Sequence, residues 1–161
     1  MKKFLLILYF FGCGVAYISA QNLSGSYIDN RHNSTAHLYL YQPKNATMLL
    51  GIVERIKGSD TSTIALIGQI RGDSLQLIEK KVIESNSGLD KCNYCFQRFY
   101  LYKKTADNTV YFDGFTEFVD KDCNAQKAQP FCFRKTKTYR TAADVPRSLL
   151  LWFKASYKNA K

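Results

Sequence analysis

The chain has 161 residues, with 23 lysines and arginines against 13 aspartates and glutamates, which gives a formal net charge of +10. Hydrophobic residues make up 46% of the chain, prolines are scarce, and no repeat or low-complexity tract is present. This length and composition fit one ordinary folded domain and exclude a disordered, fibrous or multidomain protein.

The first 20 residues have the pattern of a secretory signal peptide. Lys2 and Lys3 form a basic opening, residues 4–11 are an unbroken apolar run, and Ala20 precedes Gln21 in a run of small residues. The apolar run is shorter than the roughly 20 residues of a membrane span. We therefore expect cleavage before Gln21, export to the periplasm, cell envelope or exterior of a bacterial cell, and no transmembrane segment after processing. The alternative is a lipoprotein anchored through Cys13.

Short alternating or β-branched runs, separated by turn residues, fill most of residues 21–161, which we expect to form a single domain. They predict strands at about 23–29, 35–42, 47–57, 62–71, 74–84, 95–104, 109–119 and 130–139. Gly72 and Asp73 lie between two runs and favour a hairpin turn. Closely spaced strands without intervening helices predict an all-β fold: an eight-stranded antiparallel up-and-down barrel or a closely related sandwich.

The residues after the last predicted strand have helical spacing. Thr141 and Asp144 have the spacing of a capping box, and Val145, Leu149 and Trp152 follow at helical intervals. We expect one C-terminal α-helix at about 143–158 that packs against the barrel wall and buries most of Trp152.

The first predicted strand contains Gly25, Ser26 and Tyr27, which resemble the Gly-x-Trp opening of the calycins. This group includes lipocalins, fatty-acid-binding proteins and avidin-like proteins, and the meander with a late helix is similar in outline to lipocalins. Tyr27 stands where that family has tryptophan, and the tryptophan-rich ligand site of avidin has no counterpart here. The resemblance implies binding of a ligand or partner rather than catalysis.

Four cysteines follow the predicted signal peptide: Cys92, Cys95, Cys123 and Cys132. An even number in an exported domain predicts two disulfides, and an antiparallel meander places all four at one end of the barrel. Strand counting brings Cys92 within reach of Cys123. It leaves Cys95 and Cys132 about 10 Å apart, beyond the roughly 7 Å limit for a disulfide, unless a bulge or loop intervenes. Local pairs, Cys92–Cys95 and Cys123–Cys132, are open alternatives, as is a tetrahedral zinc site.

Two groups of residues are candidate binding surfaces. His37, Tyr39 and Tyr41 share one strand face, which suits a ligand wall; the reading we favour is an outer face covered by the helix. Near the C-terminus, basic residues far outnumber acidic ones, which suits an anionic surface, although a solvated face is the simpler interpretation. The candidate basic surface consists of Lys135, Lys137, Arg147, Lys154 and Lys158.

No catalytic or phosphate-binding motif is present, so we expect no enzymatic activity, no cofactor and no specific nucleic-acid recognition. The first functional hypothesis is a lipocalin-like binding module for a small apolar or aromatic ligand. The alternative is a secreted interaction or inhibitor domain that contacts another secreted protein through its loops and basic surface.

Overall fold

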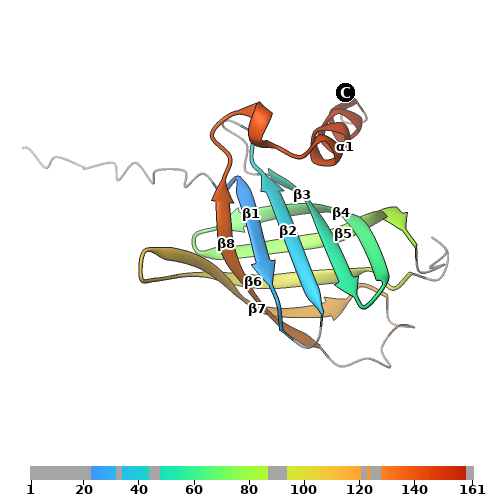
Figure 1. Cartoon of the computed structure of the whole chain (residues 1–161), viewed down its shortest axis with the longest axis horizontal. Coiled ribbons are helices and arrows are strands. Elements are labelled where there is room, and N and C mark those ends of the chain that lie inside the picture. Colours follow the sequence, from blue (N-terminus) through green and yellow to red (C-terminus); the bar gives the residue numbers. More distant parts are fainter. Residues whose placement is uncertain are drawn as a thin grey trace, which may run out of the picture.

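The computed structural model describes residues 23–31, 34–43, 48–86, 94–120, 123 and 128–158, and for residues 142, 157 and 158 the backbone alone. The predicted signal peptide, including Cys13, lies outside the described residues. Eight strands are followed by a 3₁₀ helix and an α-helix (Figure 1). The elements are β1 (Gly25–Asp29), β2 (Thr35–Tyr41), β3 (Met48–Lys57), β4 (Asp60–Arg71), β5 (Ser74–Ser85), β6 (Gln97–Ala106), β7 (Thr109–Phe118), β8 (Gln129–Thr138), η2 (Ala142–Asp144) and α1 (Arg147–Lys158).

Each strand pairs antiparallel with the next, and β8 returns to pair with β1, so the sheet closes into a barrel in simple up-and-down order. The predicted fold class is confirmed. Two-residue turns set the register where strands are joined tightly. Gly72 has a φ of 59°, and at the β6–β7 turn both Asp107 (48°) and Asn108 (58°) adopt positive φ, the conformation that suits the twist of a hairpin.

Strand alternation separates an apolar interior from the outer wall. Among the described residues, fifteen buried side chains form the inner core, and the largest fully buried ones are Tyr27, Phe99, Phe112 and Phe133. At nearly 0% exposure, these rings place most of their area away from water, and this burial is the main stabilising term of the barrel. Alternation also predicts which polar residues must point inward, because every second residue of a strand faces the core.

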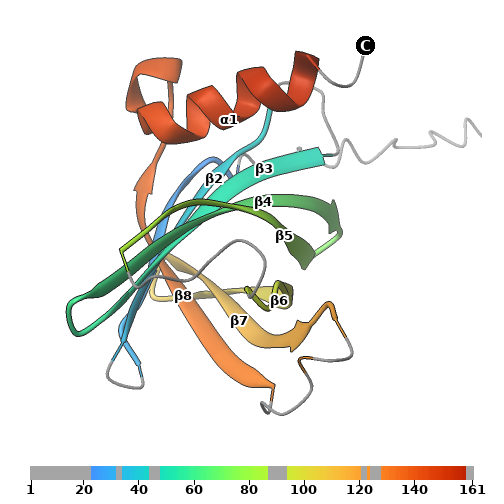
Figure 2. The same cartoon turned by 90° about the vertical axis from the view of Figure 1, so that its right-hand side faces the viewer.

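The C-terminal helix lies across the outside of β2, β3 and β4 (Figure 2). Leu149 of the helix and Val145, which lies just before it, pack against Leu50 and Ile52 of β3 in a second core cluster. The helix begins later than predicted, because residues 142–144 form a 3₁₀ turn and the carbonyl of Pro146 accepts the first helical hydrogen bond.

Trp152 is half-buried rather than largely buried, so that expectation is wrong in degree. Its ring packs beside the second core cluster, while its Nε1 donates to the carbonyl of Leu66, 3.2 Å away. A helix lying on one wall can cover only one side of such a large ring. The helix is therefore docked, with the tryptophan at the border of the contact.

At two places, one at each end of the barrel, neighbouring strands separate before their ends and their hydrogen bonding stops. We call the end with the β1–β2, β3–β4, β5–β6 and β7–β8 connections the disulfide end, and the other the far end. At the disulfide end, β5 and β6 pair only between residues 74–78 and 98–102. At the far end, β7 and β8 pair no further than Tyr111 and Arg134.

Gly25 and Tyr27 have a clear structural role on β1. A β-carbon at Gly25 would overlap the carbonyl of Lys137 and press on Cε of Lys135, so only glycine fits there. The Lys135 stem occupies the space beside Gly25, and its ammonium lies 5.6 Å from the centre of the Tyr27 ring. The Tyr27 hydroxyl donates to the carbonyl of Leu23. The Gly-x-Tyr motif thus organises the packing around Tyr27.

Candidate functional site at the disulfide end

A disulfide joins Cys95, just before β6, to Cys123 in the β7–β8 connection, with their Cα atoms 5.9 Å apart. Each of the four cysteine pairings considered from the sequence gives Cys95 or Cys123 a different partner, so all four are wrong. The hairpin turns at Asp107 and Asn108, which places residue 95 opposite residue 120, and the chain then bends back through a turn in which Cys123 donates to the carbonyl of Asp120. Because both sulfurs are in the disulfide, they are not available as zinc ligands.

Cys92 lies outside the described residues, so the predicted second disulfide stays a prediction. Cys132 is half-buried and forms no disulfide with any described residue. Its backbone N–H donates to Asp29, 2.6 Å away, and Asp29 also holds Arg31 in a two-point ion pair. Burial acts to raise the pKa of Asp29, but these hydrogen bonds outweigh it and lower the pKa below its ordinary value. The Asp29 carboxylate therefore fastens β1 to β8 at this end.

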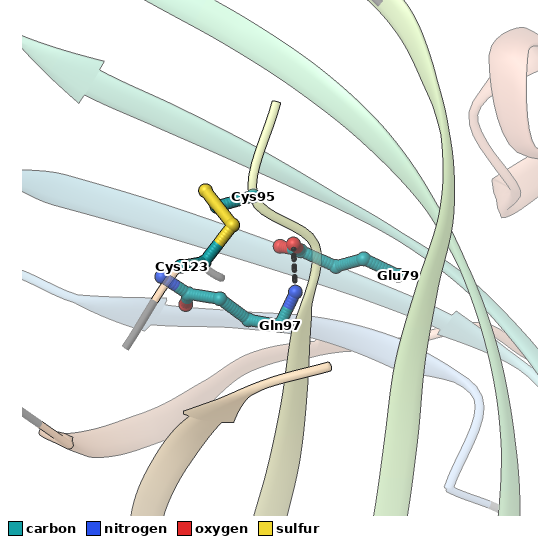
Figure 3. Close-up of a disulfide and its surroundings, with 4 residues drawn as sticks. All are labelled: Glu79, Cys95, Gln97 and Cys123. Atoms are coloured by element: carbon teal, nitrogen blue, oxygen red, sulfur yellow. Dashed lines mark hydrogen bonds between the residues drawn. A yellow bond between two sulfur atoms is a disulfide. The ribbon is translucent and has the colours of Figure 1, made fainter. Parts of the chain in front are cut away.

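Beside the disulfide, a charged cluster lies inside the barrel. Arg55 of β3 donates to Glu79 of β5 at 2.6 Å, to Gln97 of β6 at 2.8 Å and to the Tyr94 hydroxyl at 2.7 Å. The N–H of Gln97 donates to the second oxygen of Glu79 at 2.7 Å (Figure 3). Glu79 thus replaces the strand partner that β6 lacks where β5 and β6 part.

Burial sets the electrostatics of this cluster. The Glu79 side chain is 0% exposed and that of Arg55 is 24% exposed. Desolvation raises the pKa of Glu79, although Arg55 and the Gln97 N–H oppose this shift. The guanidinium also lies 5.7 Å from the centre of the Phe99 ring, and its Nε is buried and has no hydrogen-bond partner among the described residues. Arg55 is therefore fixed in position and keeps one unused donor.

Aromatic rings surround the polar cluster. Phe131 and Phe133 of β8 are stacked, 5.3 Å apart, and Phe99 contacts both. Tyr94 and Phe96 meet edge to face at 5.1 Å. Phe131, Tyr94 and Phe96 are only partly buried where they pack against the core. The disulfide end of the interior thus combines apolar rings with a few fixed polar groups, the usual lining of a small-molecule site.

The residues singled out from the sequence lie elsewhere. His37, Tyr39 and Tyr41 are on the outer face of β2, where His37 stacks on Tyr39. Tyr39 and Tyr41 pack against the cluster under α1, and Tyr41 meets Phe153 edge to face. This is the helix-covered face that we favoured, and no described contact brings these three residues to the interior cluster.

The candidate basic surface is divided. Lys137, Arg147 and Lys154 are exposed, whereas Lys135 is half-buried above Tyr27, and the side chain of Lys158 lies outside the described residues. Lys137 pairs with Asp144 at 3.4 Å. These residues therefore do not form one outward strip that includes Lys135.

The sequence analysis did not identify Arg55, Glu79 and Gln97 as candidate site residues. The signal was strand phase: Glu79 follows Leu75 and Leu77 at intervals of two, and Arg55 follows Leu49 and Val53 in the same phase. A charged residue in the inward phase of a strand predicts a buried ion pair, provided that a second such residue is found on a nearby strand.

Comparisons of this chain with protein-family models, with curated proteins and with solved structures found no match. In the described part of the chain, the helical segments are too short or too polar to span a membrane.

Proposed function

We propose that the chain is a secreted or envelope-located, non-enzymatic binding protein of lipocalin-like type. A small apolar or aromatic ligand enters the barrel at the disulfide end. The observation that carries the proposal is the Arg55–Glu79–Gln97 cluster, set among partly buried aromatic rings inside the barrel. The disulfide supports an oxidising compartment outside the cytoplasm.

The lining favours a ligand with an aromatic or aliphatic body and one hydrogen-bond acceptor. Glu79 already balances the charge of Arg55, so a neutral acceptor suits this cluster better than an anion. Phe131, Tyr94 and Phe96 offer ring surface near the solvent-exposed part of Arg55. Binding through apolar contact with one oriented hydrogen bond requires no catalytic group.

Native mass spectrometry of the exported protein, purified without denaturation, tests this proposal. We expect a small molecule that is lost when the protein is unfolded. Titration with the neutral apolar fluorophore N-phenyl-1-naphthylamine locates the site. Phe131→Trp, which enlarges a ring at the disulfide end, should weaken probe binding, whereas Tyr102→Ala on the outer wall should not. No retained molecule together with equal probe binding by both variants would overturn the proposal.

A second candidate function is interaction with another secreted protein. It is favoured by an aromatic patch on the outer face of β6 and β7, where Tyr102 is 52% exposed and Phe115 is 38% exposed and stacks on Tyr100 at 5.3 Å. Exposed rings of this kind are common anchors of protein interfaces. A protein chain retained in the native mass spectrum, and lost from Tyr102→Ser and Phe115→Ser, would favour this function.

A further inference from the structure

The far end of the barrel has a depression where β7 and β8 part. Residues 135–138 of β8 pair with β1 on one side, but on the other side the β7 ladder stops at Tyr111 and Arg134. The opening has a volume of about 320 Å³ and is lined by residues 108–110 and 135–138. None of the lining residues is acidic, and two are lysines.

Lys135 is a positioned cation rather than a mobile surface lysine. Its stem passes over Gly25, and its ammonium lies against the face of the Tyr27 ring. Within the described residues, no carboxylate lies within ion-pairing distance of Lys135. Burial and the nearby charge of Lys103 both lower the pKa of Lys135, which indicates an ammonium that a nearby anion would stabilise.

Lys137 supplies a second cation at the rim. Its side chain is 57% exposed, and its contact with Asp144 is long, at 3.4 Å. The other oxygen of Asp144 accepts the backbone N–H groups of Arg140 and Thr141, so this carboxylate is mainly engaged in holding the η2 turn. A ligand anion can therefore reach Lys137 without displacing a tight ion pair.

We propose that this depression binds a small organic anion, whose phosphate, sulfate or carboxylate group is held by Lys135 and Lys137. The volume exceeds that of a bare inorganic anion and suits a molecule of sugar-phosphate size. Asn108 and Thr138 add neutral polar groups for the rest of the ligand. This site lies at the opposite end of the barrel from the Arg55 cluster. The proposal does not depend on the function proposed for the Arg55 cluster.

Titration of the isotope-labelled protein, followed by NMR at constant ionic strength, tests the proposal. The probes are inorganic phosphate, inorganic sulfate, citrate, glucose 6-phosphate and, as the neutral control, glucose. We expect saturable shifts of the amides of residues 108–110 and 135–138 with at least one anion and none with glucose. The pattern among the anions identifies which acidic group is preferred.

Two variants test the assigned residues. Lys135→Gln should weaken binding about tenfold, as expected for the loss of a charge-assisted hydrogen bond. Lys137→Gln, which leaves the core untouched, should weaken it several-fold. Lys57→Gln removes an exposed lysine at the other end of the barrel and should leave binding unchanged. Shifts scattered over all surface lysines, equal weakening by Lys57→Gln, or no saturation with any anion would overturn the proposal.

Discussion

Arg55 and Glu79 form an interior ion pair whose two halves are buried to different depths, which predicts unequal effects of removing each. Arg55→Met deletes the three hydrogen bonds to Tyr94, Glu79 and Gln97, and leaves a fully buried carboxylate without its cation. We expect this variant to lose about 3–5 kcal/mol of stability. Glu79→Gln retains an acceptor for the Gln97 N–H and leaves a cation that is partly exposed, so we expect a loss of about 1–2 kcal/mol.

The double variant gives the sharpest result. Arg55→Met combined with Glu79→Gln has no buried charge, so it should be more stable than Arg55→Met alone, by about 1–2 kcal/mol. Urea unfolding, followed by tryptophan fluorescence and circular dichroism, measures all four free energies. If the two losses simply add, the charges do not interact and the reasoning fails.

The pH dependence provides an independent check. In the Arg55→Met variant, burial raises the folded-state pKa of Glu79 above its unfolded value, because no cation remains to oppose desolvation. Protonation then favours the folded state, so stability is retained below the unfolded pKa and lost as the pH rises through the folded pKa. The stability gap between the single and double variants should therefore close on acidification. A gap that does not change with pH would refute this account.

Three further predictions concern stability. Removing the Cys95–Cys123 disulfide, whose residues are 28 positions apart, should cost about 3–4 kcal/mol of stability in urea unfolding. The control variant Cys132→Ser should have little effect. An unchanged urea midpoint after removal of the disulfide would contradict the assignment of this disulfide. Asp29→Asn should cost about 1–3 kcal/mol at pH 7. Because the folded pKa of Asp29 is lowered from 3.8, this loss should vanish as the pH falls through the folded value, and a constant loss would argue against it. Trp152→Ala should cost about 2–3 kcal/mol, less than a fully buried tryptophan, and a neutral result in thermal unfolding would mean that α1 is not docked.

The architecture could be predicted from the sequence because local and global signals agree. Alternation from Leu38 to Tyr41, glycine and asparagine at the turns, and the absence of helical spacing before residue 140 all favour the same meander. Strand order then followed from the short connections. The helix start was displaced because Asp144 accepts N–H groups in a 3₁₀ turn rather than in the first turn of the α-helix.

Strand phase marks Arg55 and Glu79 as inward-facing, but their pairing with each other and with Gln97 could not be predicted, since it depends on three strands meeting at one level of a closed barrel. Arg55 and Glu79 are 24 residues apart in the sequence and lie on strands that are not neighbours. They come into contact because the barrel is curved and because the register between β4 and β5 shifts. The cysteine pairing failed for a related reason: the chain leaves the ladder after β7, so strand counting does not apply there. Conversely, the alternating pattern of β2 made its tyrosines candidate ligand-binding residues, yet Tyr39 and Tyr41 pack beneath α1.

The pairing of β1 with β8 has a consequence for how the domain forms. Ser26 and Thr136, which are hydrogen-bonded across this seam, are 110 residues apart, whereas every other ladder joins neighbours in the chain. Closing the seam carries the largest loop entropy of any pairing in the barrel, so it should be a late and slow event in folding. Until then, β1 and β8 each present an open strand edge that another chain can pair with. Slow folding intermediates should therefore aggregate more readily than the closed barrel, and truncation within β8 should be far more damaging than loss of α1.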